Sequence, residues 1–285
     1  MADALTILIV TFGLLFVVGH MLAMGLSLTP RMIIEPLRDL KLLFLTFLAN
    51  FIIIPAVVIG LTSVLPLPED VAVGMTILAL SAGAPFVPKL AKIAKGDVAL
   101  SVGLMTALMV GTVVIVPLVL PFILTGTTMS PWDVAKPLVV LMLLPLGIGL
   151  VLRRFFETLA EDAAKILNRV SSASLIILTF LFIFGYWNEI LNVTGTGAVL
   201  FAVLFISLAL VIGYLLGGRQ SGVRRMVGLA TAQRNIEAAI VIASVNFVYR
   251  PQVEASIIIA ALISLPMLLL VSSYWGRRTT VDRGG

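Results

Sequence analysis

The stretch Ser81–Ala82–Gly83–Ala84–Pro85–Phe86–Val87–Pro88–Lys89–Leu90–Ala91–Lys92 lies inside an apolar segment, yet it is not expected to form a continuous helix. Pro85 and Pro88 lack a backbone N–H group and clash with the preceding helical turn. They also push the residues before them toward extended conformations, and Gly83 adds conformational freedom. The stretch therefore predicts a helix that stops near Ala82, unwinds and restarts near Pro88.

A second interruption lies in the other half of the chain, at Leu229–Ala230–Thr231–Ala232–Gln233–Arg234–Asn235–Ile236–Glu237. It too places polar residues inside an apolar segment. Unwound backbone at membrane depth survives only where protein buries it or a water-filled cavity receives it. Transporters commonly carry one broken helix in each half, so the two interruptions are expected to be partners.

Composition restricts the class of protein. The chain has 285 residues, of which 60% are hydrophobic and 12% charged, and its mean hydropathy is +1.18. Long apolar segments recur throughout, as in an integral membrane protein. With no Cys and one His, the chain has little catalytic equipment, and neither an enzyme nor a cofactor is predicted. The net charge of +5 sits mainly in short links between spans, so it indicates the lipid bilayer rather than nucleic acid as partner.

The expected fold is an all-α integral membrane protein with a single transmembrane transporter domain over residues 1–285. Nine spans are predicted, at about 5–26, 42–64, 71–94, 98–124, 134–152, 170–187, 198–216, 226–248 and 253–275. The third and eighth contain the two interruptions. The segment from Arg153 to Arg169 is mixed in charge and periodically apolar, which predicts a short amphipathic helix on the membrane surface.

Basic residues set the expected orientation. Most of them fall in the links after spans 1, 3, 5 and 7 and at the C-terminus, whereas the opposite links hold only Lys136 and Arg250. The positive-inside rule then places the N-terminus outside and the C-terminus in the cytoplasm of a bacterial inner (plasma) membrane. By the same rule Thr127–Thr128 is expected outside.

The position of the breaks predicts an internal repeat. Two four-span units, at about 5–124 and 170–275, each have their broken helix third, and the span at about 134–152 lies between them. An odd number of spans separates the starts of the two units, so they run through the membrane in opposite directions. Inverted repeats of this kind are typical of alternating-access transporters.

Three motifs resemble those of the bile acid:sodium symporter (BASS) family. They are Met24–Gly25–Leu26–Ser27–Leu28–Thr29–Pro30, Ala94–Lys95–Gly96–Asp97–Val98–Ala99–Leu100–Ser101–Val102 and Gln233–Arg234–Asn235. The resemblance covers nearly the whole chain, which is similar to the family's nine-helix form. It implies a panel domain and a core domain, two broken helices that cross in the core, an organic-anion substrate and sodium coupling.

The sodium ligands of the family are mostly replaced. A family Glu at the second break is Ala230 here, a Gln is Arg234, and a Thr in the fourth span is Met105; the family's Ser-Asn at the first break reads Val87 and Pro88. Ser101 and Gln233 remain as candidates for a residual sodium site. Asn235 matches a position that the resemblance associates with the substrate and the crossover.

The candidate substrate-binding or crossover residues share a place in or beside the two interruptions. They are Gly83, Lys89, Thr231, Gln233, Arg234, Asn235 and Glu237. Unpaired basic residues at membrane depth are costly and normally face a cavity or a partner. Lys89 and Arg234 are therefore hypothesised to act as fixed cations in place of sodium. The alternatives are an ion pair between Arg234 and Glu237 at i,i+3, and lysines at 89 and 92 that extend toward the cytoplasm.

Other polar residues have structural and functional interpretations side by side. Glu237 is either a proton carrier or the permanent partner of Arg234, and the ion pair is the favoured alternative. His20 is expected to be a packed, hydrogen-bonded residue. Asn50 and Asn246 are expected to make hydrogen bonds between helices.

The sequence thus predicts a secondary transporter of a small or amphipathic organic anion, working by alternating access, with sodium coupling in question because the ligands are lost. An ordinary sodium-coupled symporter is the first alternative, and a membrane substrate sensor or channel is the second. A channel needs a continuous polar pore, whereas the polar residues here concentrate at two breaks.

Overall fold

The computed structural model describes residues 2–34, 38–124 and 129–281, and in these ranges the regular elements are all helices. In chain order the elements are α1 (Ala2–Ser27), α2 (Pro30–Ile34), α3 (Leu40–Leu48), η2 (Ala49–Ile53), α4 (Ile54–Val64), α5 (Glu69–Leu80), α6 (Val87–Ile93), α7 (Val98–Ile123), α8 (Pro131–Leu138), η3 (Val139–Leu143), α9 (Leu144–Phe155), α10 (Glu157–Gly185), α11 (Trp187–Gly195), α12 (Ala198–Leu216), α13 (Ser221–Ala232), α14 (Ile236–Asn246) and α15 (Pro251–Val281).

Seven continuous helical segments in the described ranges are long and apolar enough to cross a membrane. They are Ala4–Ser27, Leu40–Val64, Val98–Ile123, Pro131–Phe155, Glu157–Gly185, Ala198–Leu216 and Pro251–Arg278. They correspond to seven of the predicted spans. The other two predicted spans are each split into a pair of shorter helices, α5 with α6 and α13 with α14.

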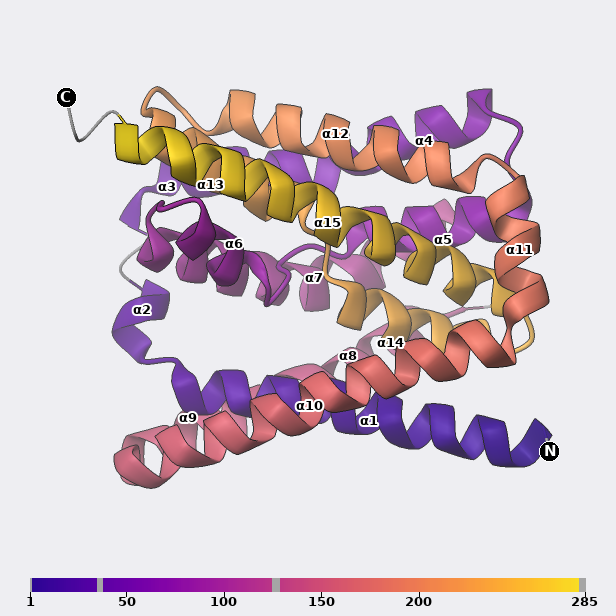
Figure 1. Cartoon of the computed structure of the whole chain (residues 1–285), viewed down its shortest axis with the longest axis horizontal. Helices are drawn as coiled ribbons and strands as arrows, with labels where there is room; N and C mark the ends of the chain where they lie inside the picture. The colour runs from indigo at the N-terminus through magenta and orange to yellow at the C-terminus, as the bar shows by residue number, and fades with distance from the viewer. Residues whose placement is uncertain (1, 35–37, 125–128, 282–285) are drawn as a thin grey trace.

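The helices form two groups (Figure 1). Helix α1 packs along α9 and α10, and these three form the layer at the bottom of the view. The remaining long helices, with both split pairs, lie above them. Within the lower layer α1 and α9 approach so closely that a Cβ atom added at Gly25 would lie 2.2 Å from the carbonyl oxygen of Leu146. Glycine at this crossing therefore lets the two backbones touch.

Helix α10 differs from the expectation. The segment from Arg153 to Arg169 was predicted to be a separate surface helix, but α9 ends at Phe155 and α10 continues without interruption from Glu157 to Gly185. There is no proline between these bounds and no glycine before Gly185, so nothing in the local sequence stops the helix. The amphipathic segment is the first half of a long helix rather than an element of its own.

Two of the long segments contain a π-helical turn. Ala49–Ile53 separates α3 from α4, and Val139–Leu143 separates α8 from α9. In both cases a proline follows two residues after the turn, Pro55 and Pro145 respectively. A π turn commonly accompanies a site of function or a local change of hydrogen-bond register. The first one carries the buried Asn50, which reaches the site described below.

The first prediction concerns orientation. Helix α1 begins and α15 ends at opposite ends of the bundle (Figure 1). Gly195 and Gly222 lie on either side of α12, and a Cβ atom at either position would meet nothing within 4 Å. Because the chain has no cysteine, Gly195→Cys and Gly222→Cys give clean single labels. We expect an impermeant thiol reagent to label position 195 in intact cells and position 222 only after lysis.

The reverse pattern would contradict the positive-inside assignment, and labelling of both positions from outside would contradict a membrane crossing by α12. Thr127–Thr128, expected on the same side as Gly195, lies outside the described residues.

Candidate functional site

Both predicted helix breaks are present. Helix α5 ends at Leu80 and α6 begins at Val87, while α13 ends at Ala232 and α14 begins at Ile236. In the first break Gly83 has φ of +80°, a left-handed conformation that favours glycine. A Cβ atom there would also lie 2.1 Å from the backbone nitrogen of Met109 on α7. Gly83 is therefore required by both its conformation and its packing.

Asn235 joins the two breaks. Its backbone N–H donates to the Ser81 carbonyl at 2.9 Å, and its side-chain amide donates to the Gly83 carbonyl at 3.2 Å. The Oδ1 atom of the same side chain accepts from the Ala238 N–H at 3.0 Å and caps α14. Asn235 is fully buried, so one residue satisfies backbone groups of the first break and starts the second half-helix.

Thr112 on α7 supports the first break from the other side. Its hydroxyl group accepts from the Ala82 N–H at 2.8 Å and lies 2.9 Å from the Ala82 carbonyl oxygen, to which it donates. Nothing in the sequence singled out this threonine, because hydroxyl groups inside helices usually bond to their own backbone. The unwound segment thus has partners from two different elements.

Arg234 is buried where two helix ends meet, with 2% of its surface exposed. Its guanidinium donates to the Leu78 carbonyl at 3.2 Å and the Ala79 carbonyl at 2.5 Å, both in the last turn of α5. It also donates to the Thr231 carbonyl at 3.0 Å near the end of α13. These carbonyls belong to the negative ends of two half-helices, which a cation stabilises.

Asn50 completes the surroundings of this guanidinium. Its Oδ1 atom accepts from Arg234 at 2.6 Å, and its amide nitrogen donates to the Thr231 hydroxyl at 3.1 Å. The expectation that Asn50 bonds between helices is confirmed. The same expectation for Asn246 is wrong, because its amide donates at 3.0 Å to the Ile242 carbonyl of its own helix.

A cavity of about 440 Å³ lies beside the second break. Its walls come from α1 and α10 on one side and from the two breaks, α14 and α15 on the other. Most of the lining is apolar, including Phe16, Phe86 and Phe182, whereas Gln233, Arg234 and Glu237 supply polar groups. A few polar groups in a mainly apolar cavity of this size are typical of small-molecule sites.

The partner of Glu237 is His20, not Arg234. The Nδ1 atom of His20 on α1 lies 2.5 Å from Oε1 of Glu237 on α14, so the two side chains join the two groups of helices across the cavity. The expected i,i+3 pair between Arg234 and Glu237 is therefore wrong. Arg234 precedes the first residue of α14, and i,i+3 spacing brings side chains together only within a helix.

The two lysines near the first break are exposed. The Lys89 ammonium lies 5.3 Å from the centre of the Phe86 ring, and Phe86 lines the cavity. Lys89 is thus at the edge of the cavity rather than inside it. Lys92 lies one helical turn farther along α6.

The two candidate sodium ligands, Ser101 and Gln233, do not line the same cavity. Gln233 lines the cavity, but Ser101 is not among its lining residues and donates to the Val98 carbonyl on α7 at 2.7 Å. In the described chain no group of three or more His, Cys, Asp or Glu side chains is arranged to hold a metal ion.

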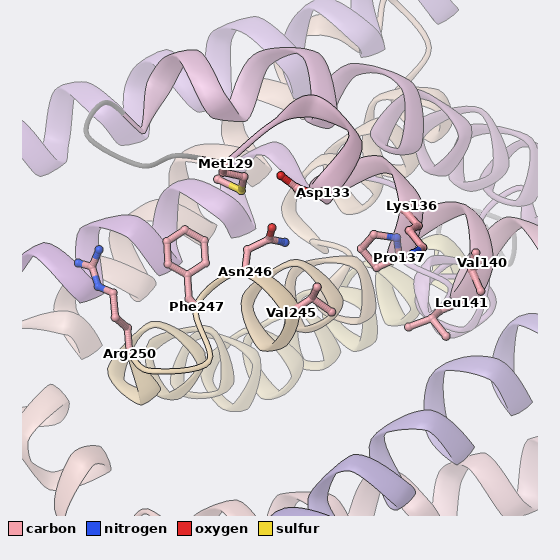
Figure 2. A pocket seen from close by; sticks show the side chains of 10 residues that line it. All are labelled: Met129, Asp133, Lys136, Pro137, Val140, Leu141, Val245, Asn246, Phe247 and Arg250. Carbon is pink, nitrogen blue, oxygen red and sulfur yellow. The ribbon is translucent and has the colours of Figure 1, made fainter.

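A second cavity, of about 830 Å³, separates α8 and η3 from the end of α14 (Figure 2). Its lining includes Asp133, Lys136, Asn246 and Arg250. Arg250 forms ion pairs with Glu69 and Asp70. Sequence reasoning did not predict this cavity, although the two basic residues on the expected outer links, Lys136 and Arg250, both line it.

Comparison with known proteins agrees with the motifs. Residues 12–195 match the model of the Sodium Bile acid symporter family. An uncharacterized sodium-dependent transporter of Bacillus subtilis, YocS, is 28% identical over 198 residues, which are 69% of this chain and 60% of that protein. A probable chloroplastic sodium/metabolite cotransporter of Arabidopsis thaliana is 26% identical over 271 residues, 90% of this chain and 61% of the relative.

A second such cotransporter from Arabidopsis is 25% identical over 236 residues, 80% of this chain and 57% of the relative. The aligned regions thus span about three fifths of the relatives' own length. The family and these relatives are transporters and not enzymes. This agrees with the prediction from composition that the chain is not an enzyme.

The second prediction tests the geometry of the first break. Gly83→Ala places a Cβ atom against the Met109 backbone at a positive φ, so we expect a loss of at least about 2 kcal/mol of stability. Gly60→Ala is the matched control, since a Cβ atom there meets nothing within 4 Å inside α4 and helix propensity favours alanine. Thermal unfolding in detergent measures both variants; equal melting temperatures would refute the strained turn.

Proposed function

Because the chain belongs to the sodium bile acid symporter family, whose model matches more than half of it, we propose that it is a secondary transporter of a small or amphipathic organic anion. One observation carries the proposal: the two helix breaks bond to each other at the wall of a cavity of about 440 Å³. With its seven apolar helices the protein is integral to the membrane.

The two groups of helices fit an alternating-access mechanism. We assign α1, α9 and α10 to a panel unit and the other long helices to a core unit. The cavity of about 440 Å³ lies where these groups face each other, with α1 and α10 on the panel side and the two breaks, α14 and α15 on the core side. In this proposal each broken pair crosses the membrane once, so seven long helices and two broken ones make nine crossings, arranged as inverted repeats.

The polar end of the cavity suits an amphipathic anion. The aromatic and aliphatic lining accepts an apolar body, and Lys89 at the edge supplies an exposed positive charge beside Phe86. Gln233 and Glu237 offer polar atoms at the inner end. The proposed substrate class is therefore an organic anion with a sizeable apolar part, a description that includes conjugated bile acids.

We further propose that Arg234 takes the place of sodium at the crossover. Its guanidinium already neutralises carbonyls at the ends of α5 and α13. A sodium ion about 4 Å from it would be repelled by about 4 kcal/mol at an effective dielectric near 20, roughly a thousandfold in affinity. Transport by this chain is therefore expected to depend weakly on sodium.

Ordinary sodium symport is the second candidate. The relative from Bacillus is named a sodium-dependent transporter, and those from Arabidopsis are named probable sodium/metabolite cotransporters. These names favour a sodium site, whereas the residues that stand at the family's ligand positions favour its loss.

The third prediction separates these candidates. Taurocholate, a permanently charged bile acid, serves as probe in proteoliposomes that contain the purified protein. We expect saturable uptake that is stimulated by unlabelled taurocholate inside the vesicles. Replacement of sodium by choline, with the pH equal on both sides, should change the uptake rate less than about twofold, because Arg234 supplies the positive charge that sodium would otherwise supply. Uptake that collapses in choline would overturn the role assigned to Arg234.

The fourth prediction concerns the anion. Lys89→Gln should weaken taurocholate binding about fivefold, since it removes a charge worth about 1 kcal/mol at an exposed position. Lys92→Gln is the matched control, one turn farther from Phe86 on the same helix. Competition binding at low ionic strength measures both variants. Equal losses would show that Lys89 acts only through the general field of the protein.

A further inference from the structure

We propose that His20 and Glu237 form a proton-binding site, and that a proton accompanies the substrate anion through this transporter. The inference rests on the proposed function, because it names the coupling ion of the same cavity. It starts from a contact between two groups of helices that no sequence motif predicts.

The contact has the chemistry of a proton site. His20 Nδ1 and Glu237 Oε1 lie 2.5 Å apart, with 26% and 6% of the respective side chains exposed. An imidazole nitrogen and a carboxylate oxygen can form a hydrogen bond only with a proton between them. The pair can therefore hold one proton as a neutral imidazole with a carboxylate, two as an imidazolium with a carboxylate, and three when the carboxyl group is protonated as well.

One oxygen of the pair is buried and, among the described residues, has no hydrogen-bond partner. Within the described chain, Glu237 Oε2 is buried without a hydrogen-bond partner, and the same is true of Gln233 Oε1; both residues line the cavity. A buried acceptor without a donor is costly. A proton on Glu237 turns its carboxylate into a donor, which can then bond to the head group of a bound anion.

Two other charged side chains, those of Lys89 and Arg234, lie near the pair. Lys89 on α6 is the further charged side chain that acts on His20, and Arg234 lines the same cavity. The guanidinium of Arg234 is held by four hydrogen bonds. The lining residues that α10 and α15 contribute in the described ranges are uncharged. His20 and Glu237 are thus the groups of this lining that are in contact with each other and whose side chains can gain or lose a proton.

Electrostatics then couples the proton to the anion. A carboxylate or sulfonate about 4 Å from an ionised Glu237 would bind about a thousandfold more weakly, at an effective dielectric near 20, than beside a neutral carboxyl group. A proton taken up by the pair offsets this repulsion, either by neutralising the carboxylate or by placing an imidazolium beside it. By reciprocal linkage a bound anion raises the affinity of the pair for its proton by the same factor.

The proposed cycle conserves protons and charge. From one side of the membrane the pair takes up one proton and the cavity takes up one monovalent anion. When the α1 layer and α14 separate, the His20–Glu237 contact breaks, and the proton and the anion leave together on the other side. No net charge moves, and the sodium gradient is not used.

Proteoliposomes in sodium-free buffer test the coupling. Taurocholate is the probe because its sulfonate stays ionised, so a pH gradient cannot drive it passively across the lipid. An outside pH of about 6 against an inside pH of about 7.5 should raise the initial uptake rate of the wild type at least threefold over equal pH. In Glu237→Gln and in the double variant with His20→Gln, the gradient should have no effect. The double variant keeps two side chains that can bond to each other.

Glu254→Gln is the matched control. Glu254 is a half-buried acidic residue on α15, but it is not part of the cavity lining, so its replacement should leave the stimulation intact. Loss of stimulation in Glu254→Gln and not in Glu237→Gln would overturn the assignment.

Counter-exchange separates the two proposals. Exchange of labelled for unlabelled taurocholate at equal pH needs transport but no net proton movement. Exchange without any stimulation by the gradient would overturn the proton site and leave the transporter standing. Absence of exchange and of uptake under every condition would instead contradict transport of this anion.

A second measurement decides the proton site without transport. The chain has a single histidine, so protein labelled with ¹⁵N-histidine gives one imidazole signal by nuclear magnetic resonance. Its titration midpoint should differ by at least one pH unit between the wild type and Glu237→Gln, and be unchanged in Glu254→Gln. Identical midpoints in all three proteins would refute the pairing on which the inference depends.

Discussion

The structure depends on how two unwound backbone segments are kept satisfied away from water. Carbonyls of Leu78 and Ala79 are paired by Arg234, and those of Ser81 and Gly83 are paired by Asn235. Leaving such a group unpaired in the apolar core of a membrane protein costs several kcal/mol. Since these four carbonyls find their donors in the second break, and Thr112 on α7 pairs only the backbone groups of Ala82, the first break cannot be satisfied without the second. Two interruptions about 150 residues apart in the sequence thus form a single structural unit.

Much of this unit could be predicted from the sequence because its causes are local. Pro85 and Pro88 prevent a continuous helix whatever surrounds them, and the boundaries observed at Leu80 and Val87 agree with that expectation. The same holds for a second break at Gln233 to Asn235 and for the seven long apolar helices. The continuity of α10 was not predicted. The amphipathic pattern was interpreted as a separate helix that ends before the next span, although no residue within it stops a helix.

The partners of polar side chains could not be predicted, because they are set by tertiary contacts. Sequence spacing suggested Glu237 for Arg234, but the break directs the guanidinium toward α5 and leaves the carboxylate facing His20. Thr112, which bonds both backbone groups of Ala82, carries no signal at all in its own helix. Asn50 could be predicted as an interhelical contact but not as the neighbour of a guanidinium, because it lies in a π turn, where the hydrogen-bond register of the helix changes.

These contacts bear on how an ion gradient would drive the proposed transport of an anion. A coupling ion does work only if it binds on one side and leaves on the other, so that its gradient biases the two arrangements of the protein. Arg234 cannot leave. A covalently attached cation can therefore reproduce the structural effect of sodium on the helix ends, but it cannot transmit a sodium gradient.

If Arg234 has replaced the ion, transport is either passive or driven by another species that dissociates. Of the charged groups that line the cavity in the described chain, only His20 and Glu237 contact each other between the two groups of helices, and this pair is the one that we propose carries a proton. The proposed replacement of sodium by Arg234 therefore requires another ion that can dissociate, and the His20–Glu237 pair is where we propose that a proton takes this role.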